Sequence, residues 1–338
     1  MAGGRRPTPT LGDVLRARKA IADVASRTPL MESDELSRQL GREVQLKLEV
    51  LQATHSFKVR GAANRILALS GEERRRGVVT ASTGNHGRAV AHVARRLGIA
   101  AVVFVSRLVG ENKLVEIRKL GAEVRIAGVG QDEASVAAKK LAAERSMTLV
   151  NPFDDPEVIA GQGTVALEIL DDRSPATIVV PVGGGGLISG IALVAKSIDP
   201  RIRIIGVSMQ RGPAMYESLR AGAPTEVEEL PTLADSLGGG IFLDNRYTFE
   251  LTRRFVDDLV LVSEREIADA MILLVRAHHL AVEGAGAVGV AALLAGRVSG
   301  DGEVAVVLSG ANVDAAKLAQ LVLDRGSKAD AAAPPGTL

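Results

Sequence analysis

The chain of 338 residues contains no cysteine and no tryptophan, and aromatic residues make up only 2% of it. Without cysteine, the protein cannot have disulfides, thiolate nucleophiles or cysteine-ligated zinc and iron–sulfur centres. With so few aromatic rings, its core has to be built mainly from Ala, Val, Leu and Ile. Nothing in these absences argues against an ordinary globular enzyme, because apolar residues still account for 46% of the chain.

An excess of either charge is also missing. The 41 Lys and Arg residues against 40 Asp and Glu residues give a formal net charge of +1. We therefore expect a small-molecule substrate and no nucleic-acid or anionic membrane partner. The N-terminal MAGGRRPTPT precedes no apolar run, which predicts no secretory signal and favours a cytoplasmic location. The uncharged stretch 174–195 approaches a bilayer span in length, but Pro181 and four glycines interrupt it.

Short apolar runs alternate with longer segments that have apolar residues at helical spacing. The short runs are rich in β-branched residues, as is typical of buried strands, and lie at 44–50, 77–82, 100–106, 122–128, 176–182, 202–208 and 303–309. The helical patterns lie at 87–97, 112–120, 133–144, 161–170, 187–196, 264–278 and 315–324. This alternation predicts the α/β class, with parallel sheets and right-handed crossovers.

The spacing of these elements also suggests how the chain is divided. Three strand–helix units between 77 and 150 predict a small α/β domain, and segments 1–76 and 151–325 would together form a larger, discontinuous one. The first ten residues and residues 326–338, which are rich in Ala, Gly and Pro, are expected to be tails, the latter disordered. A ligand is expected in the cleft between two such domains.

A run of four glycines, Gly183-Gly184-Gly185-Gly186, directly follows the predicted strand at 176–182 and precedes an apolar helix. A tight turn would explain one or two glycines, but each costs about 0.5 to 1 kcal/mol relative to alanine. Converging backbone N–H groups at a helix N-terminus bind phosphate well, so the run predicts an anion site. It matches neither the dinucleotide nor the nucleotide-hydrolase fingerprint, which favours a lone phosphate.

Polar residues also follow the predicted strand at 77–82, in the sequence Ser82-Thr83-Gly84-Asn85-His86. A helix N-cap needs only one such residue. The whole group would offer several donors to a carboxylate or phenolate at a helix N-terminus. His86 could act as a general base, but no Asp or Ser partner is evident by spacing, and a structural role is an equal alternative.

Two further junctions complete the set of candidates. Ser309-Gly310-Ala311-Asn312 closes the predicted strand at 303–309, where a simple turn capped by Asn312 is the plain alternative to a site. Lys58 lies between the apolar strand at 44–50 and a stretch of small residues. Most lysines are solvated surface charges. A lysine partly desolvated among uncharged groups has instead a lowered pKa and can form a Schiff base as a nucleophile.

Taken together, these motifs resemble those of the fold-type II pyridoxal-phosphate enzymes related to threonine/serine dehydratase and serine racemase. The resemblance runs from about 27 to 323 and rests on RTPL (27–30), LKLEVLQATHSFKVRGA (46–62), ASTGNHG (81–87), PVGGGGLISG (181–190), EGAGAVGVAALL (283–294) and SGANVD (309–314). Other phrases, notably PTLADSLGGGIFLDNRYTF (231–249), look most like the dehydratase-like enzyme of hydroxyectoine breakdown.

The resemblance implies two parallel-type α/β domains with pyridoxal 5'-phosphate in the cleft between them. Lys58 would be the covalent anchor of this cofactor and the base that takes the Cα proton, and Phe57 would pack beside the ring. The glycines at 183–186 would hold the phosphate, Asn85 would bond the phenolic oxygen, and Ser309 would face the pyridine nitrogen. A neutral hydroxyl in that place does not enforce a protonated ring.

Ser82, Thr83 and His86 are implied as the groups that receive the substrate carboxylate. Thr83 is also a catalytic candidate, because racemases of the family carry a serine hydroxyl there, on the cofactor face opposite the lysine. The activity implied is elimination of water from a β-hydroxy amino acid, such as threonine, serine or a hydroxylated diaminobutyrate, to a 2-oxo acid and ammonia. The resemblance also implies a homodimer.

The sequence departs from the family at the segment that binds a divalent cation in some relatives. Residues 206–214 contain no carboxylate, and the first one follows only at Glu217, so no metal site is expected. No regulatory domain is expected after Asp314, which favours a catabolic enzyme. Arg107, Arg211 and the segment 236–246 are candidates for substrate selection.

Alternative functions stay open at this point. An amino-acid racemase could use the same scaffold, and a non-catalytic protein could bind the cofactor without turnover. A dinucleotide-dependent oxidoreductase would need GxGxxG after a strand and an acidic residue about twenty positions on, and this fingerprint is missing.

Overall fold

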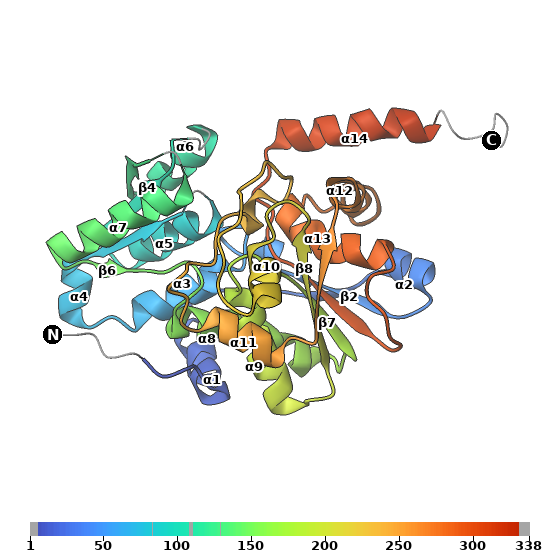
Figure 1. Ribbon diagram of the computed structural model, residues 1–338, viewed down its shortest axis with the longest axis horizontal. Helices are drawn as coiled ribbons and strands as arrows, with labels where there is room; N and C mark the ends of the chain where they lie inside the picture. The colour runs from blue at the N-terminus through green and yellow to red at the C-terminus, as the bar shows by residue number, and fades with distance from the viewer. Residues whose placement is uncertain (1–5, 83, 108–110, 129, 331–338) are drawn as a thin grey trace.

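The computed structural model describes residues 6–82, 84–107, 111–128 and 130–330, which form two sheets flanked by helices (Figure 1). The larger sheet has six strands in the order β1-β2-β10-β7-β8-β9, and the smaller has four in the order β5-β4-β3-β6. Neighbouring strands are parallel throughout, except that β1 runs antiparallel to β2. The prediction of an α/β protein with parallel sheets is therefore confirmed.

The strands of the larger sheet are β1 (Leu30–Glu32), β2 (Val44–Leu48), β7 (Thr177–Pro181), β8 (Arg203–Met209), β9 (Asp258–Val262) and β10 (Val304–Leu308). Those of the smaller sheet are β3 (Val78–Ala81), β4 (Ala101–Val105), β5 (Glu123–Ile126) and β6 (Thr148–Leu149). The helices are α1 (Leu11–Ala20), α2 (Asp34–Leu40), α3 (Lys58–Leu67), α4 (Gly71–Arg76), α5 (Asn85–Arg96), α6 (Glu111–Lys119), α7 (Gln131–Arg145), α8 (Pro156–Asp172), α9 (Gly186–Ile198), α10 (Ala214–Ala221), α11 (Thr248–Phe255), α12 (Glu264–His278), α13 (Gly284–Leu294) and α14 (Ala315–Asp330), with 3₁₀ turns η1 (Glu49–Leu51) and η2 (Asp235–Leu237).

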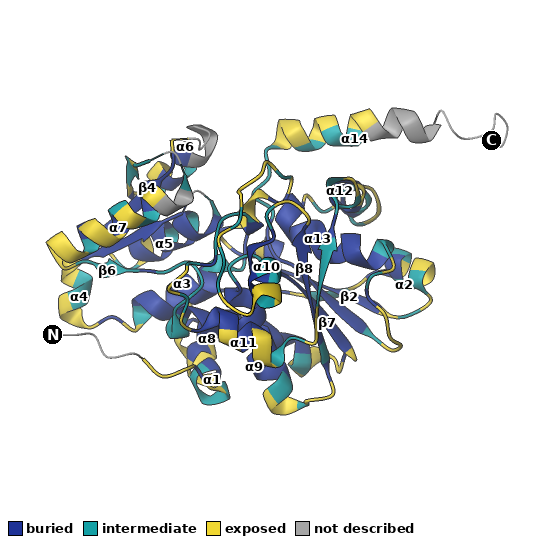
Figure 2. Cartoon of the chain, in the orientation of Figure 1, coloured by how far each residue is buried: buried dark blue, intermediate teal, exposed yellow. Residues whose placement is uncertain are grey.

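Both faces of the larger sheet are covered by helices. Along β10, Val304, Val306 and Leu308 join the core beneath α12 and α13, whereas Ala305 and Val307 join the core beneath α8 and α9. Successive side chains of a strand point to opposite faces, so a strand covered on both faces has to be apolar throughout. This explains why the central strands appear in the sequence as continuous apolar runs, and why β2, β7, β8 and β10 are dark blue in Figure 2.

The smaller sheet is likewise enclosed, by α3, α5 and α6 on one face and by α7 on the other. One prediction about it is wrong in part. The strand expected at 122–128 exists as β5, but it lies at the sheet edge, and Ile126 is 54% exposed instead of buried. A run of apolar residues does not reveal whether a strand has a neighbour on both sides.

The two ends of the chain are more ordered than predicted. Thr10 caps α1 in a capping box with Asp13, and the Tyr247 hydroxyl donates a hydrogen bond to the carbonyl of Arg6 (2.8 Å). At the other end, α14 extends to Asp330, so the disordered tail predicted from 326 begins inside a helix, and 331–338 lie outside the described residues. The strands β1, β6 and β9 were not predicted either.

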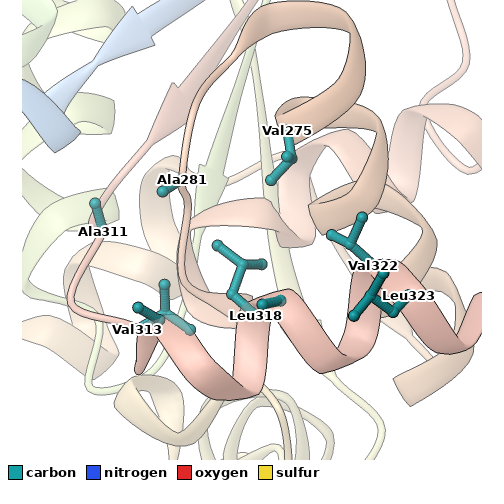
Figure 3. A pocket seen from close by; sticks show the side chains of 9 residues that line it. Val275, Ala281, Ala311, Val313, Leu318, Val322 and Leu323 are labelled. Carbon is teal, nitrogen blue, oxygen red and sulfur yellow. The ribbon is translucent and has the colours of Figure 1, made fainter.

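Strands from β3 to β6 form the smaller sheet and all the others form the larger one, although a division into two domains remains a prediction. Helix α14 runs beside α12 and projects beyond the rest of the molecule (Figure 1). The groove that it forms has a volume of about 440 Å³ and an apolar lining (Figure 3) that includes Val275, Ala281, Val313, Leu318, Val322 and Leu323. Within the described ranges, none of the helices has the length and apolar character needed to cross a membrane.

Four buried charged residues, the Arg60 cluster, join α3 to the larger sheet: Lys47, Glu49, Arg60 and Glu168. Arg60 is 1% exposed and donates to Glu49 (2.7 and 2.8 Å) and to Glu168 (2.6 and 2.8 Å). Lys47 donates to Glu168 (2.6 Å) and to the carbonyl of Thr28 (2.6 Å). Two cations are thus paired with two carboxylates. Because buried charges need short, well-directed hydrogen bonds to remain paired, this cluster fixes the position of α3 relative to β2 and α8.

We expect Arg60→Ala to lower the free energy of unfolding by about 3 to 5 kcal/mol, because it leaves two buried carboxylates with one cation. Urea denaturation followed by circular dichroism measures the change. Arg16→Ala is the control: its ion pair with Asp13 lies at the surface, and its loss should cost less than about 1 kcal/mol. Equal losses in the two variants would contradict a special role for the Arg60 cluster.

Candidate functional site

Four connections converge where parallel strands end. Segment 52–57 follows β2 and η1, Ser82 and Gly84 follow β3, 183–185 follows β7, and 309–314 follows β10. A cavity of about 40 Å³ lies among them. Its walls contain the predicted residues Phe57, Lys58, Asn85, Gly183, Gly184, Gly185, Gly186 and Ser309, together with Phe153, Ser236, Leu237 and Glu283. The structure thus brings together eight of the predicted site residues, as expected for the carboxyl ends of strands in an open sheet.

Lys58 is the first residue of α3, and its side chain is half-buried at the cavity. Its Nζ donates a hydrogen bond to the carbonyl of Pro152 (2.8 Å) and lies 5.2 Å from the centre of the Phe57 ring. Burial lowers the pKa of Lys58 to about 8, although the Glu283 carboxylate opposes this shift. A minor but usable fraction of the amine is therefore neutral, and hence nucleophilic, near neutral pH.

The loop before Lys58 is bound to the loop after β10. The N–H of Phe57 donates to the carbonyl of Ser309 (3.1 Å), and the N–H of Ala311 donates to the carbonyl of His55 (2.9 Å). His55 has a φ of 55°, a left-handed conformation that closes the turn. These bonds place the Ser309 hydroxyl and the Lys58 amine in the walls of one cavity although the two residues lie far apart in the chain.

The first two of the four glycines are packed so closely that side chains would not fit. A Cβ on Gly183 would lie 2.8 Å from the carbonyl oxygen of Leu237, and one on Gly184 would lie 2.3 Å from the Phe153 ring. Gly185 has a φ of 87°, which L side chains rarely adopt. Helix α9 begins directly after it with no side-chain cap, so its first N–H groups are left to bind an anion.

Asn85, Glu283 and Asn312 form a hydrogen-bonded group, which we call the Asn85 network. Asn85 Nδ2 donates to Glu283 Oε1 (2.6 Å), and Asn85 Oδ1 accepts from Asn312 Nδ2 (2.5 Å). The N–H of Asn312 donates to Glu283 Oε2 (3.1 Å), and its Nδ2 also donates to the carbonyl of Thr54 (3.0 Å). Glu283 is only 4% exposed, so the cavity wall contains a buried carboxylate.

The sequence analysis did not identify Glu283 as a site residue. It also gave Asn312 the alternative role of a helix cap, which the structure contradicts. Asp314, and not Asn312, caps α14, because its carboxylate accepts from the N–H groups of Ala316 (2.9 Å) and Lys317 (3.1 Å). The glutamate stands in the EGAGAVG motif, immediately before a helix, and its only signal in the sequence is an acidic residue at an apolar helix N-terminus.

His86 and Ser82 are buried but do not line the cavity. His86 Nε2 lies 3.1 Å from the carbonyl of Val150 and must donate to it, since a carbonyl only accepts. Burial and the nearby Lys58 charge lower the pKa of His86 to about 3, so the ring is neutral and its Nδ1 is an acceptor. A neutral imidazole in this state offers no second ring N–H to a carboxylate. The part in substrate binding predicted for the His86 side chain is therefore not supported by its geometry, whereas backbone N–H groups at the start of α5 remain available. Thr83 lies outside the described residues.

A segment that sequence reasoning overlooked, 151–155, crosses the site. The carbonyl of Pro152 accepts from Lys58, and the Phe153 ring stacks on Phe242, with centroids 4.7 Å apart. Asp155 before Pro156 is a helix start that the sequence displays, because it combines an N-cap with proline at the first helical position. Its role at the site, however, follows only from tertiary contacts.

The two arginines proposed for substrate selection, Arg107 and Arg211, are exposed and do not line the cavity, and Arg211 donates to the carbonyl of Pro231 (2.7 Å). Ser236 and Leu237, from the third candidate segment, do line it. In the part of the chain that the structure describes, no three His, Asp or Glu side chains are grouped so that they could hold a metal ion.

Comparison with known proteins gives consistent results. The family described as "Pyridoxal-phosphate dependent enzyme" matches residues 21–310, most of the chain. A Sinorhizobium fredii protein, provisionally named as a threonine dehydratase, is 50% identical over 90% of this chain and 92% of its own length. The L-threonine ammonia-lyase of Thermotoga maritima is 46% identical over 90% of this chain and 76% of its own length.

A solved structure shares the fold as well. Maize serine racemase superposes with a TM-score of 0.88 at 33% identity, covering 96% of this chain and all of the racemase chain. The chain therefore belongs to the pyridoxal-phosphate-dependent enzymes, and within them to the lyases related to threonine dehydratase.

Proposed function

We propose that this lyase removes water from a β-hydroxy amino acid at the cavity around Lys58 and yields a 2-oxo acid and ammonia. The observation that carries the proposal is the meeting of a half-buried lysine of lowered pKa, a glycine loop at an uncapped helix and a serine hydroxyl in one cavity. This donor set fits pyridoxal phosphate, which needs an amine for its aldehyde and N–H groups for its phosphate. When bound, the cofactor withdraws electrons from the Cα of an amino acid.

Each wall of the cavity would hold one part of the cofactor. The N–H groups of 183–186 and of the first turn of α9 would bind the phosphate. Asn85 would donate to the phenolic oxygen, and Ser309 would face the ring nitrogen with a neutral hydroxyl. Phe57 would pack beside the ring. Ser82, Thr83 and the backbone N–H groups at the start of α5 would receive the substrate carboxylate.

Lys58 has two tasks in this proposal. It anchors the cofactor and, once the substrate amine has taken its place, removes the Cα proton as a neutral base. Its lowered pKa suits both, because the amine is deprotonated for part of the time near neutral pH. The carbonyl of Pro152 accepts a bond from this amine and orients it. After the β hydroxyl has left as water, the enamine product becomes an imine, and water converts it to the 2-oxo acid and ammonia.

Threonine is the first substrate to consider, because two similar relatives are named for it, and serine is the next as a β-hydroxy amino acid of the same kind. Another possible substrate is a hydroxylated diaminobutyrate of hydroxyectoine breakdown, because the sequence of segment 231–249 resembles that of the dehydratase-like enzyme of this pathway. This segment includes Ser236 and Leu237, which line the cavity beside the glycine run. A second candidate activity, amino-acid racemisation, is favoured by the likeness to maize serine racemase. It would require the Thr83 hydroxyl as a second proton carrier.

We propose further that the enzyme is a homodimer, as its resemblance to the family implies. Size-exclusion chromatography with light scattering would give twice the mass of 35.3 kDa. A mass equal to one chain at micromolar concentration would contradict the proposal.

Lys58→Ala is expected to abolish attachment of the cofactor, so that the purified variant stays colourless with added pyridoxal phosphate while the wild-type protein turns yellow. In the wild-type apoprotein, the rate of attachment should rise with pH around a midpoint near 8, because only the neutral amine attacks. Stopped-flow absorbance measures both. Lys196→Ala is the control, a partly buried lysine that pairs with Asp257 outside the cavity. A yellow Lys58→Ala protein, or a rate independent of pH, would refute the assignment.

Release of 2-oxo acid from threonine, serine and 3-hydroxy-2,4-diaminobutyrate separates the possible substrates. We expect turnover of at least one of them, followed with a coupled dehydrogenase, and none in Lys58→Ala. Chiral chromatography of the remaining amino acid measures racemisation in the same samples. A yellow protein that releases no 2-oxo acid but inverts an amino acid would make the racemase the correct function, and one that does neither would leave a non-catalytic binding protein.

A further inference from the structure

The Asn85 network places a buried carboxylate in the cavity wall, directly beside Asn85. Asn85 and Glu283 are 7% and 4% exposed, and both also line the cavity. The three members come from the start of α5, the start of α13 and the loop after β10. A structural role alone, as a cap for α13, does not account for this arrangement, because Glu283 forms no side-chain cap with that helix.

The hydrogen bonds leave only one orientation for the Asn85 amide. Both oxygens of Glu283 accept from N–H groups, one from Asn85 Nδ2 (2.6 Å) and one from the Asn312 backbone (3.1 Å). A carboxylate has no proton to donate, so Asn85 has to turn its NH₂ group toward it. The Asn85 oxygen then faces Asn312 Nδ2 (2.5 Å), which donates to it.

The orientation of Asn312 is fixed in the same way. Its Nδ2 also donates to the carbonyl of Thr54 (3.0 Å), which only accepts. Both N–H groups of the Asn312 side chain thus donate to oxygens inside the network, whereas one of the two side-chain N–H groups of Asn85 remains available for another acceptor. The nearest partner of that remaining N–H is the Ser236 hydroxyl at 3.5 Å, too long for a strong bond.

We propose that Glu283 and Asn312 are positioning residues that act through Asn85, holding its remaining N–H toward the cavity as the donor to the cofactor's phenolic oxygen. The inference rests on the assignment of Asn85 in the proposed function. A charge-assisted bond to Glu283 polarises the Asn85 amide, which strengthens its other N–H as a donor.

Two substitutions test this with little change of shape. Glu283→Gln presents one acceptor and one donor, and so it can satisfy only one of the two N–H groups that the carboxylate accepts. Asn312→Asp places acceptors against the carbonyl of Thr54 and the Asn85 oxygen. Either change frees the Asn85 amide to rotate.

The experiment is a double-mutant cycle on cofactor affinity, measured by titrating each apoprotein with pyridoxal phosphate and following absorbance. We expect Glu283→Gln to weaken binding about tenfold in the wild-type background, the loss of one charged hydrogen bond. In the Asn85→Ala background it should have no further effect, since its route to the cofactor is gone. Asn312→Asp should follow the same pattern.

Controls separate positioning from folding. Glu303→Gln changes a partly buried glutamate at the opposite end of β10 and should leave cofactor affinity unchanged, and thermal unfolding of each apoprotein identifies variants that do not fold. If Glu283→Gln binds like the wild type, or loses affinity equally in both backgrounds, the inference is overturned. If Asn85→Ala binds the cofactor normally, the inference fails while the function proposed for Lys58 stands; a colourless wild-type protein would remove that function.

Discussion

Two buried carboxylates and two buried cations pair with one another next to the helix start that carries Lys58, and the rest of the site depends on their mutual neutralisation. Arg60 and Lys58 lie in the first turn of the same helix. Burial alone would raise the pKa of Glu168, but Arg60 and Lys47 hold it below its ordinary value. The four groups can remain ionised together only in one geometry, so α3 has one position relative to β2 and α8. The place of Lys58 at the cavity follows from that position.

The same desolvation has opposite uses at two neighbouring bases. It lowers the pKa of Lys58 to about 8 but that of His86 to about 3. Both donate to carbonyls of one short segment, Lys58 to Pro152 and His86 to Val150. Near neutral pH, only the lysine exchanges its proton. His86 stays uncharged and serves as a hydrogen-bond donor to the backbone. Of these two side chains, only Lys58 therefore changes its protonation state in this pH range.

Much of the site could be read from the sequence because its parts are local signals. Lys58, the glycine run and Ser309 each lie at a junction between a strand and a helix. Such junctions are recognisable in a sequence because small and polar residues follow an apolar run. Glu283 and Phe153 could not be found in this way. Their roles arise from contacts across the chain, such as the bond between Asn85 and Glu283, which are 198 residues apart. Likewise, the exposure of β5 depends on its having no second neighbour, which a local pattern does not encode.

The packing of the glycine run has a consequence for how this chain can vary. Its positions are closed to substitution for separate reasons: the backbone of Leu237 blocks the first, the Phe153 ring blocks the second, and a left-handed φ restricts the third. No single compensating change elsewhere could open all of them. A stretch whose composition suggests a flexible linker is thus a rigid part of the site, in which the surrounding backbone and ring decide the residue type at each of these positions.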